Sequence, residues 1–214
     1  MIVYNEMINN WINKKYLNYK AINKIRNSFL KSKPYPNFVL HDFFNENKLI
    51  NLKKEILKES FEKIDKDLFS LSHTKDLVSS DSSLIKEFYS LLSSKEFTSL
   101  MEKLTGKRLS QKVDMQSHSL VQGDYLLFHD DVVEGRSIAY IVYLSDLKEE
   151  DGGRLQLYDI KHPTSPIKRI NPAFNAFACF KVSAKSLHDV EEIKTKKQRL
   201  TIGGWFYGNN PSAS

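Results

Sequence analysis

Cysteine is nearly absent from this chain, and so are long apolar runs. Cys179 is the single cysteine among 214 residues, so no internal disulfide can form. It lies in the apolar run 177–180, and we therefore interpret it as a core residue and not as a nucleophile. The N-terminus shows no secretory signal pattern, and no apolar stretch is long enough to span a bilayer. We expect a folded protein of the reducing cytoplasm that makes no membrane contact.

Negative charge is scarce in the first 34 residues. Seven lysine and arginine side chains accompany only Glu6 there, a net charge of +6 that leaves the remaining residues neutral. A basic segment of this kind can contact RNA or an acidic protein surface. Its apolar residues recur at helical spacing, and no aromatic and basic residues interleave as in RNA-binding modules. We interpret 1–34 as a basic amphipathic helical extension with a solvated charged face, and nucleic-acid contact is the alternative.

Helical and β-prone segments are unevenly distributed over the rest of the chain. Residues 38–44 predict a short strand, and the Ser-, Asp- and Thr-rich stretch 71–82 predicts a loop. Apolar residues at helical spacing predict helices over 46–57, 83–93 and 95–105, with Asn45 as a cap and Gly106 as a stop. From about residue 107 onward, glycines and prolines separate short β-prone segments, namely 120–121, 125–129, 137–144, 154–158, 177–182 and 199–207.

This order of elements predicts an α+β protein. Helices first and many short strands afterwards are typical of helices packed on one sheet of a double-stranded β-helix, or jelly roll. We expect one such domain over 35–214, in which 35–106 provide mainly helical support and 107–214 form the β core.

The most specific set of residues lies in this second half. A β-prone segment ends in His129, Asp130 and Asp131; His188 follows His129 by 59 residues, and Arg199 comes 11 residues later. Two imidazoles and a carboxylate can occupy one face of an octahedral Fe(II) ion, which is the facial triad of non-haem oxygenases. In a continuous strand, His129 and Asp131 share one face and Asp130 points away. This alternation selects Asp131 as the carboxylate ligand.

The remaining histidines are weaker candidates for this site. His162 precedes a proline in a turn-like segment with no arginine at the matching offset, so we interpret it as a surface residue. His41 and His73 have no carboxylate at ligand spacing and are interpreted as structural or solvated. His118 lies near the start of the first core strands and could edge the pocket.

The stretch 121–207 resembles the prolyl 4-hydroxylase type of iron(II)/2-oxoglutarate-dependent dioxygenase, and most of all the ribosomal-protein prolyl hydroxylases. The likeness rests first on the His-Asp-Asp triplet and on an arginine, Arg136, that opens the strand-like run 138–144. It rests further on a Gly-Gly-x-Leu-x-Leu-Tyr run over 152–158 and an Arg-Leu-x-Ile-x-Gly-Trp-Phe run over 199–206.

This resemblance implies Fe(II), 2-oxoglutarate and O2, with ascorbate as a reductant. It places the far carboxylate of 2-oxoglutarate on Arg199 and on the hydroxyl of Tyr143. Arg136 and Trp205 lie where related enzymes face their substrate, although a salt bridge at the start of a strand and a core position are the respective alternatives. The implied iron ligands are His129, Asp131 and His188.

The chain departs from the family pattern in two respects. The ribosomal-protein enzymes have a tyrosine nine residues before the first iron histidine, where this sequence has Leu120. Tyr125, four residues before that histidine, is a candidate replacement in the cosubstrate pocket. Some of those enzymes also carry a second, non-catalytic jelly roll that has no counterpart before Ser214, so we expect the substrate docking that it provides to be absent or supplied by another surface.

The function implied is hydroxylation of an unactivated C–H bond with release of succinate and CO2. We expect the target to be a prolyl residue of a protein or peptide, for example in a translation component. One alternative is a hydroxylase of a free amino acid, a peptide natural product or a sugar precursor. Another is a binding domain with an inactive jelly roll, which the presence of the whole triad and of Arg199 disfavours. The sequence makes no prediction of the oligomeric state.

Overall fold

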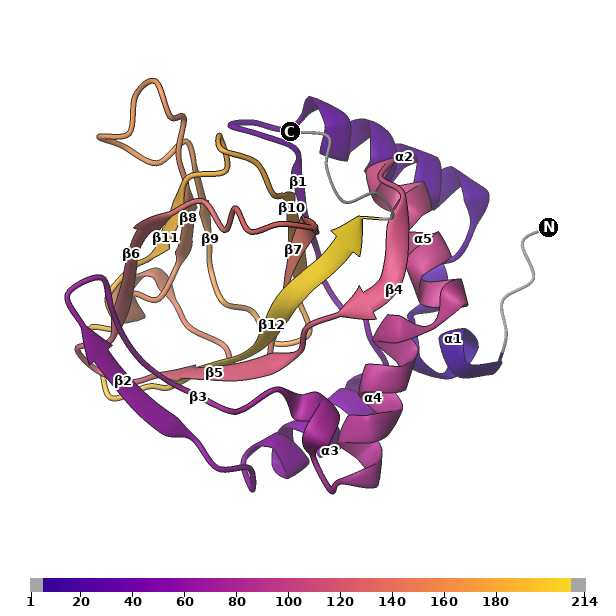
Figure 1. Cartoon of the computed structure of the whole chain (residues 1–214), viewed down its shortest axis with the longest axis horizontal. Helices are drawn as coiled ribbons and strands as arrows, with labels where there is room; N and C mark the ends of the chain where they lie inside the picture. Colours follow the sequence, from indigo (N-terminus) through magenta and orange to yellow (C-terminus); the bar gives the residue numbers. More distant parts are fainter. Residues whose placement is uncertain (1–5, 209–214) are drawn as a thin grey trace.

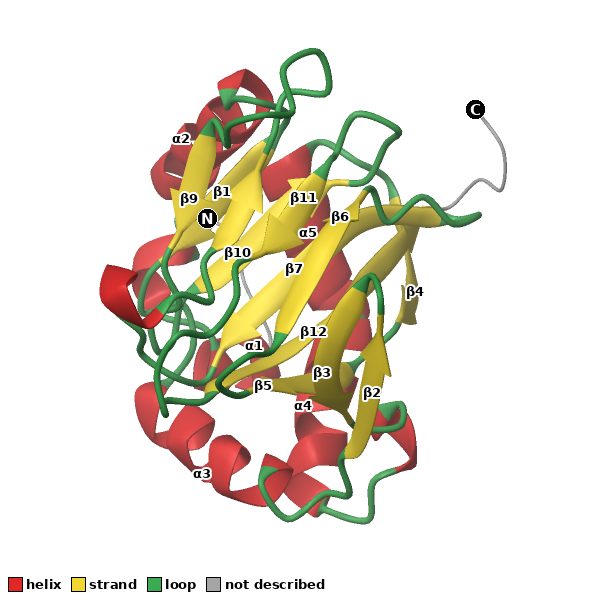
Figure 2. Ribbon diagram, turned by 90° about the vertical axis from the view of Figure 1, so that its left-hand side faces the viewer, coloured by secondary structure: helices red, strands yellow, loops and turns green. Residues whose placement is uncertain are grey.

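The computed structural model describes residues 6–208, and its helices gather on one side of a strongly curved sheet (Figures 1 and 2). Short 3₁₀ turns lie at Lys14–Tyr16, Leu77–Ser79 and Glu149–Asp151. The α-helices are α1 (Glu6–Trp11), α2 (Tyr19–Lys31), α3 (Glu46–Ile56), α4 (Ser83–Ser93) and α5 (Lys95–Thr105).

The sheet is antiparallel throughout and curves into a nearly closed double-stranded β-helix, as predicted. The strands are hydrogen-bonded in the order β1-β10-β7-β12-β5-β3-β6-β11-β8-β9, with β2 beside β3 and β4 beside β12. Their bounds are β1 (Asn37–Leu40), β2 (Glu62–Lys66), β3 (Phe69–His73), β4 (Leu109–Val113), β5 (Gln116–Leu120), β6 (Tyr125–His129), β7 (Arg136–Tyr143), β8 (Leu155–Leu157), β9 (Lys168–Ile170), β10 (Phe177–Lys181), β11 (His188–Val190) and β12 (Arg199–Gly208).

The start of α3 and the end of α5 arise from the local interactions that the sequence predicted. The side chain of Asn45 accepts a hydrogen bond from the Lys48 backbone N–H at 3.2 Å, so it caps the first turn of α3. Gly106 ends α5 with a φ of 72°, in the left-handed region that glycine adopts without strain. The helices that support the sheet were therefore readable from local sequence alone.

The hairpin of β2 and β3 was missed, and the prediction of a loop over 71–82 was wrong at its start. In β2 only Ile64 is apolar and no residue is buried, so the strand carries no alternation of buried and exposed residues. The hairpin is held instead by distant partners, since β3 pairs with both β5 and β6. This pairing places the hairpin along the sheet that carries the site (Figure 2).

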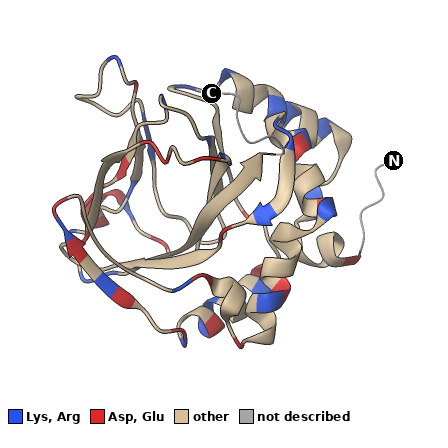
Figure 3. Cartoon of the chain, in the orientation of Figure 1, with Lys and Arg blue, Asp and Glu red and all other residues tan. Residues whose placement is uncertain are grey.

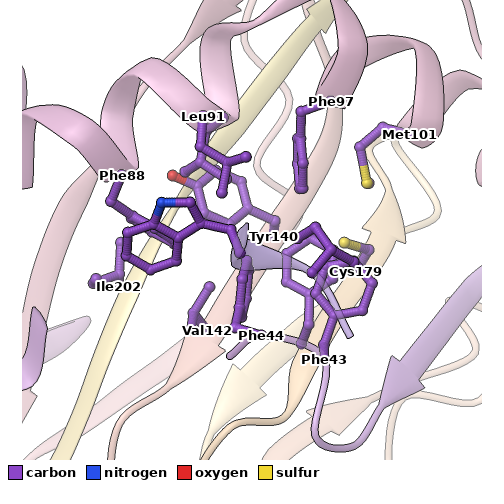
Figure 4. Packing of buried hydrophobic residues seen from close by; sticks show 14 of the residues in the cluster. Phe43, Phe44, Phe88, Leu91, Phe97, Met101, Tyr140, Val142, Cys179 and Ile202 are labelled. Atoms are coloured by element: carbon purple, nitrogen blue, oxygen red, sulfur yellow. The ribbon is translucent and has the colours of Figure 1, made fainter. Parts of the chain in front are cut away.

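Helices and sheet meet in an aromatic core (Figure 4). Phe177 of β10 stacks on Phe43 with ring centres 4.7 Å apart, and it meets the edge of Phe44 at 5.6 Å. Phe88 of α4 contacts Phe44, and Trp11 of α1 contacts Phe88 at 5.1 Å. Aromatic pairs of this geometry add to the energy of burial, so this core couples the N-terminal helices to the sheet.

The N-terminal segment has one buried side and one charged side. Ile22 and Phe29 of α2 are buried in the shared core, while its lysines and arginine lie on the outer side of the helix (Figure 3). Within residues 6–208, no helix is long and apolar enough to cross a membrane. Residues 1–5 of the predicted extension and 209–214 of the predicted domain lie outside the described part, and the boundary at residue 34 stays a prediction.

The aromatic core predicts a large loss of stability on truncation of Phe177. The substitution Phe177→Ala should lower the free energy of unfolding by about 3–5 kcal/mol, because it removes a fully buried ring that contacts Phe43 and Phe44. Chemical denaturation measures this. Tyr19→Ala is the control, since Tyr19 is 71% exposed and should change the free energy by less than about 0.5 kcal/mol. Equal effects of the two substitutions would contradict the assigned core.

Candidate active site

A cavity of about 290 Å³ lies inside the β-helix. Its walls come from strands on both sides of the fold, including β3, β5, β6, β7, β11 and β12. Apolar side chains make up much of its surface. The polar residues that line it include His73, His118, His129, Asp131, His188, Arg199 and Thr201.

Three of the predicted site residues meet at one end of this cavity. His129 ends β6 and His188 begins β11, and their Cα atoms are direct partners across the two strands. The Asp131 carboxylate lies between the rings, with Oδ1 3.6 Å from His129 Nε2 and Oδ2 3.4 Å from His188 Nε2. One potential ligand atom from each residue lies within 4.8 Å of the others, so the three could hold a metal ion.

Asp131 reaches this position for a different reason from the one predicted. Strand β6 ends at His129, and Asp131 lies in the following loop with a φ of 65°, in the left-handed region. The Asp130 side chain instead accepts a hydrogen bond from the Val132 N–H at 3.0 Å. A tight loop turn, and not the alternation of a strand, therefore directs Asp131 toward both imidazoles. The predicted strand over 125–129 is confirmed, but the alternation used to select Asp131 does not extend beyond His129.

Backbone carbonyls fix the tautomer of both imidazoles. Nδ1 of His129 lies 2.8 Å from the Leu127 carbonyl oxygen, and Nδ1 of His188 lies 2.7 Å from that of Ser186. A carbonyl can only accept, so each Nδ1 carries the proton and donates it. Both Nε2 lone pairs are thereby left free toward Asp131, as metal coordination requires.

Burial and neighbouring groups shift the pKa values of His129 and Asp131. Burial lowers the pKa of His129, and nearby His188 acts in the same direction against the opposing effect of Asp131. Burial alone would raise the pKa of Asp131, but the adjacent imidazoles of His188 and His129 outweigh it and lower the pKa. Two imidazole Nε2 atoms and one carboxylate on one side of a cavity fit a divalent metal such as Fe(II).

Arg199 provides a buried positive charge in the same cavity. It opens β12 and is 3% exposed, and its Nε donates to the Gly153 carbonyl at 2.9 Å. Its Nη2 and the nearby hydroxyl of Tyr143 are both buried, and neither has a hydrogen-bond partner among residues 6–208. The nearby cation Lys197 is paired with Asp151 at 2.7 Å and does not line the cavity. An anion would satisfy both unpaired groups.

Trp205 and Arg136 lie together near the opposite end of β12. Trp205 shares the inward face of this strand with Arg199 and lines the cavity. The guanidinium of Arg136 lies 3.3 Å from the centre of the indole ring, and within the described chain it has no acidic partner. Arg136 thus stacks on Trp205 instead of forming the alternative salt bridge.

Tyr125 does not reach the cavity, which corrects its prediction as a replacement cosubstrate residue. A β-bulge in β6 separates the paired positions Leu126 and His129, so Leu126 and not Tyr125 shares the cavity with His129. The Tyr125 hydroxyl points outward, 3.5 Å from the Asp67 carbonyl. Leu120 does line the cavity, at the position where the resembling enzymes have a tyrosine.

Two histidines that the sequence did not assign to the site also line the cavity. His73 of β3 and His118 of β5 are direct partners across these two strands. His118 was expected at most to edge the pocket, and His73 was interpreted as structural or solvated. Alternation with Leu120 along β5 would have indicated the inward face of His118, but only once 116–120 was recognised as a strand.

Comparison with known proteins identifies the family. Residues 115–207 match the sequence profile of the 2OG-Fe(II) oxygenase superfamily. The chain carries a 2OG-Fe(II) oxygenase domain. The family predicted from the sequence is thereby confirmed, and the matched segment includes the metal cluster and Arg199.

Curated relatives of this oxygenase domain are named as prolyl hydroxylases. Prolyl 3-hydroxylase OGFOD1 of Xenopus laevis is 35% identical over 185 residues, which cover 84% of this chain and 36% of that protein. Prolyl 3-hydroxylase sudestada1 of Drosophila melanogaster is 36% identical over 159 residues, covering 69% and 29%. The chain therefore spans about a third of the length of the curated relatives it matches.

Solved structures share the fold of the oxygenase domain. A prolyl-4-hydroxylase of Pseudomonas putida superimposes with a TM-score of 0.72 at 13% identity, covering 88% of this chain and 100% of that one. A Trichoplax adhaerens prolyl hydroxylase, solved with a hypoxia inducible factor peptide fragment, gives 0.70 at 15%, covering 88% and 90%. These matches confirm the predicted double-stranded β-helix.

The geometry around Asp131 predicts a contrast between two adjacent carboxylates. Asp131→Asn should weaken Fe(II) binding at least about a hundredfold, because it removes the charge between His129 and His188. Asp130→Asn is the matched control, since its amide oxygen can still accept the Val132 N–H. Anaerobic Fe(II) titration of both variants measures the affinity. Equal affinities would contradict the placement of the metal.

Proposed function

We propose that the protein is an Fe(II)- and 2-oxoglutarate-dependent dioxygenase that hydroxylates a prolyl residue in a polypeptide. The observation that carries this proposal is the combination, in one cavity, of the His129, Asp131 and His188 cluster with the unpaired Arg199. Fe(II) would supply the oxidation chemistry, in which 2-oxoglutarate, O2 and the C–H bond become succinate, CO2 and the C–OH group. The names of the curated relatives support the prolyl target.

Each of the predicted site residues below has a role in this proposal. His129 and His188 offer Nε2 and Asp131 offers its carboxylate to Fe(II). Arg199 and Tyr143 donate to the far carboxylate of 2-oxoglutarate, whose charge replaces the missing counter-ion. The apolar walls exclude water, which strengthens these polar contacts and protects the reaction. Leu126, Leu155, Phe180 and Val190 contribute to these walls.

Exposed apolar side chains around the metal residues favour a polypeptide substrate over a free amino acid. Leu127 and Phe128 precede His129 and are 42% and 48% exposed, while Val132 and Val133 follow Asp131 at 52% and 53%. Exposed apolar side chains that cluster in this way mark binding surfaces for larger partners. We name these four residues the apolar rim and propose that it holds the chain on either side of the target proline. A peptide bound to the structurally similar Trichoplax adhaerens enzyme is consistent with this.

The remaining parts of the proposal concern the setting of the reaction. Ascorbate would restore ferrous iron after unproductive oxidation, and the reducing cytoplasm suits a ferrous site in a chain whose single cysteine is buried. The charged side of α2 would face solvent or an acidic or nucleic-acid surface close to the substrate. A small-molecule substrate is the alternative, and it does not account for the apolar rim.

Turnover of 2-oxoglutarate tests the activity directly. Succinate formation in the presence of a proline-containing peptide library, with a +16 Da product in mass spectra, is the expected result for the unmodified protein. His129→Ala should abolish both signals. Arg199→Ala should raise the KM for 2-oxoglutarate at least tenfold, because it removes a hydrogen bond to a charged group. Such a bond contributes about 1.5 kcal/mol or more to binding. An unchanged KM would show that another group binds the carboxylate.

The apolar rim makes a separate prediction about the peptide. Val133→Asp should raise the KM for the peptide several-fold and leave the KM for 2-oxoglutarate unchanged, because it places a charge on the rim and not inside the cavity. Val78→Asp is the matched control, an identical change at a residue that is 48% exposed and outside the cavity lining. A similar rise in the KM for the peptide in both variants would show that the apolar rim does not bind the substrate.

A further inference from the structure

The imidazole of His118 faces the cavity without a hydrogen-bond partner among residues 6–208. The side chain is partly buried, so its ring nitrogens are available to a ligand in the cavity. We propose that His118 is a cosubstrate-positioning residue that donates a hydrogen bond to the far carboxylate of 2-oxoglutarate beside Arg199. This inference rests on the proposed function.

The register between β5 and β12 places His118 near the start of β12. Across the antiparallel pair, Leu120 is the partner of Arg199, and His118 is the partner of Thr201. His118 and Leu120 both line the cavity from β5. Because Leu120 has no group that forms hydrogen bonds, His118 is the nearest inward residue of β5 able to contact an anion held by Arg199.

The ring of His118 lies close to Gly203 of β12. A Cβ atom on Gly203 would lie 3.7 Å from Nδ1 of His118, in ordinary contact, so the imidazole lies directly over the backbone of β12. This position is further along β12 than Arg199 and closer to Trp205. The ring therefore lines the cavity between Arg199 and Trp205 along β12.

The surroundings of His118 keep it neutral. Burial, the charge of Arg199 and the neighbouring His73 together lower the pKa of His118 to about 4, and Asp131 opposes them less strongly. A neutral imidazole carries one N–H donor and adds no second positive charge beside Arg199.

Two other roles fit the geometry less well. His118 is not part of the group of potential ligand atoms formed by His129, Asp131 and His188 in the described chain, so it is no additional metal ligand. His73 also lines the cavity, but its Nδ1 lies 2.9 Å from the Thr74 carbonyl and already has a partner there. Of the two histidines, His118 is the one whose ring has no hydrogen-bond partner among residues 6–208.

Calorimetric titration of the Mn(II)-loaded protein with 2-oxoglutarate tests this role without turnover. His118→Leu should weaken binding at least about tenfold, the effect of losing one hydrogen bond to a charged group. His118→Gln should recover much of the affinity, because its amide can donate. His162→Leu, the same substitution at an exposed histidine, should bind as the unmodified protein does. The probe 2-oxobutyrate, which lacks the far carboxylate, should bind the unmodified protein and His118→Leu equally.

The outcomes separate this inference from the proposed function. If the unmodified protein does not bind 2-oxoglutarate, the proposed function fails and this role fails with it. If the unmodified protein and His118→Leu bind 2-oxoglutarate equally well, only the role of His118 is overturned. The same holds if the substitution weakens binding of 2-oxobutyrate as much as binding of 2-oxoglutarate. Thermal unfolding shows whether each variant folds. If His118→Leu does not fold, His118→Met, which also lacks a donor, gives the same comparison with His118→Gln.

Discussion

The constraint on which the site depends is the burial of the Arg199 guanidinium without a counter-ion in the described chain. An isolated buried charge costs several kcal/mol even after relaxation. The fold tolerates it because Arg199 begins a strand that pairs on both sides, with β5 and with β7, and because the Gly153 carbonyl accepts its Nε–H. Gly153 has a φ of 73°, in the left-handed region that glycine adopts without strain, and a Cβ there would lie 3.3 Å from Arg199 Cδ.

Strand β12 also fixes the position of Arg199 relative to the three potential metal ligands in the cavity. Arg199 and Trp205 both face inward from β12, while His129 and His188 are held opposite by the β6 and β11 pair. Backbone carbonyls orient both imidazoles, so few side-chain movements are needed before a metal binds. The aromatic core behind the sheet holds this arrangement in place, since it locks the helices to β10.

Local sequence patterns predicted those parts of the fold and site that local interactions determine. The helix over 95–105 and its stop at Gly106 follow from apolar periodicity and glycine chemistry. Cys179 is 1% exposed, and burial raises the pKa of its thiol, as its interpretation as a core residue requires. His188 and Arg199 could be assigned to the same site as the triplet of residues 129–131, because their spacing and neighbouring residues resembled a known family.

The failures lie where distant strands or irregular backbone decide the structure. The β-bulge that turns Tyr125 outward and the left-handed turn that directs Asp131 inward both break the alternation on which the prediction relied. Strand β3 pairs with β5 and β6, more than forty residues away in sequence, so no periodicity within 69–73 could reveal it. The inward position of His118 depends on that same pairing.

The most direct test of this account is a crystal structure of the protein grown anaerobically with Mn(II) and 2-oxoglutarate. The account predicts an anomalous peak from Mn(II) that lies beside three groups, namely Nε2 of His129, Nε2 of His188 and the Asp131 carboxylate. It also predicts the far carboxylate of 2-oxoglutarate on Arg199 Nη2 and the Tyr143 hydroxyl. A metal bound elsewhere, or a 2-oxoglutarate that leaves Arg199 unpaired, would contradict the central claim that the buried guanidinium exists to hold the cosubstrate.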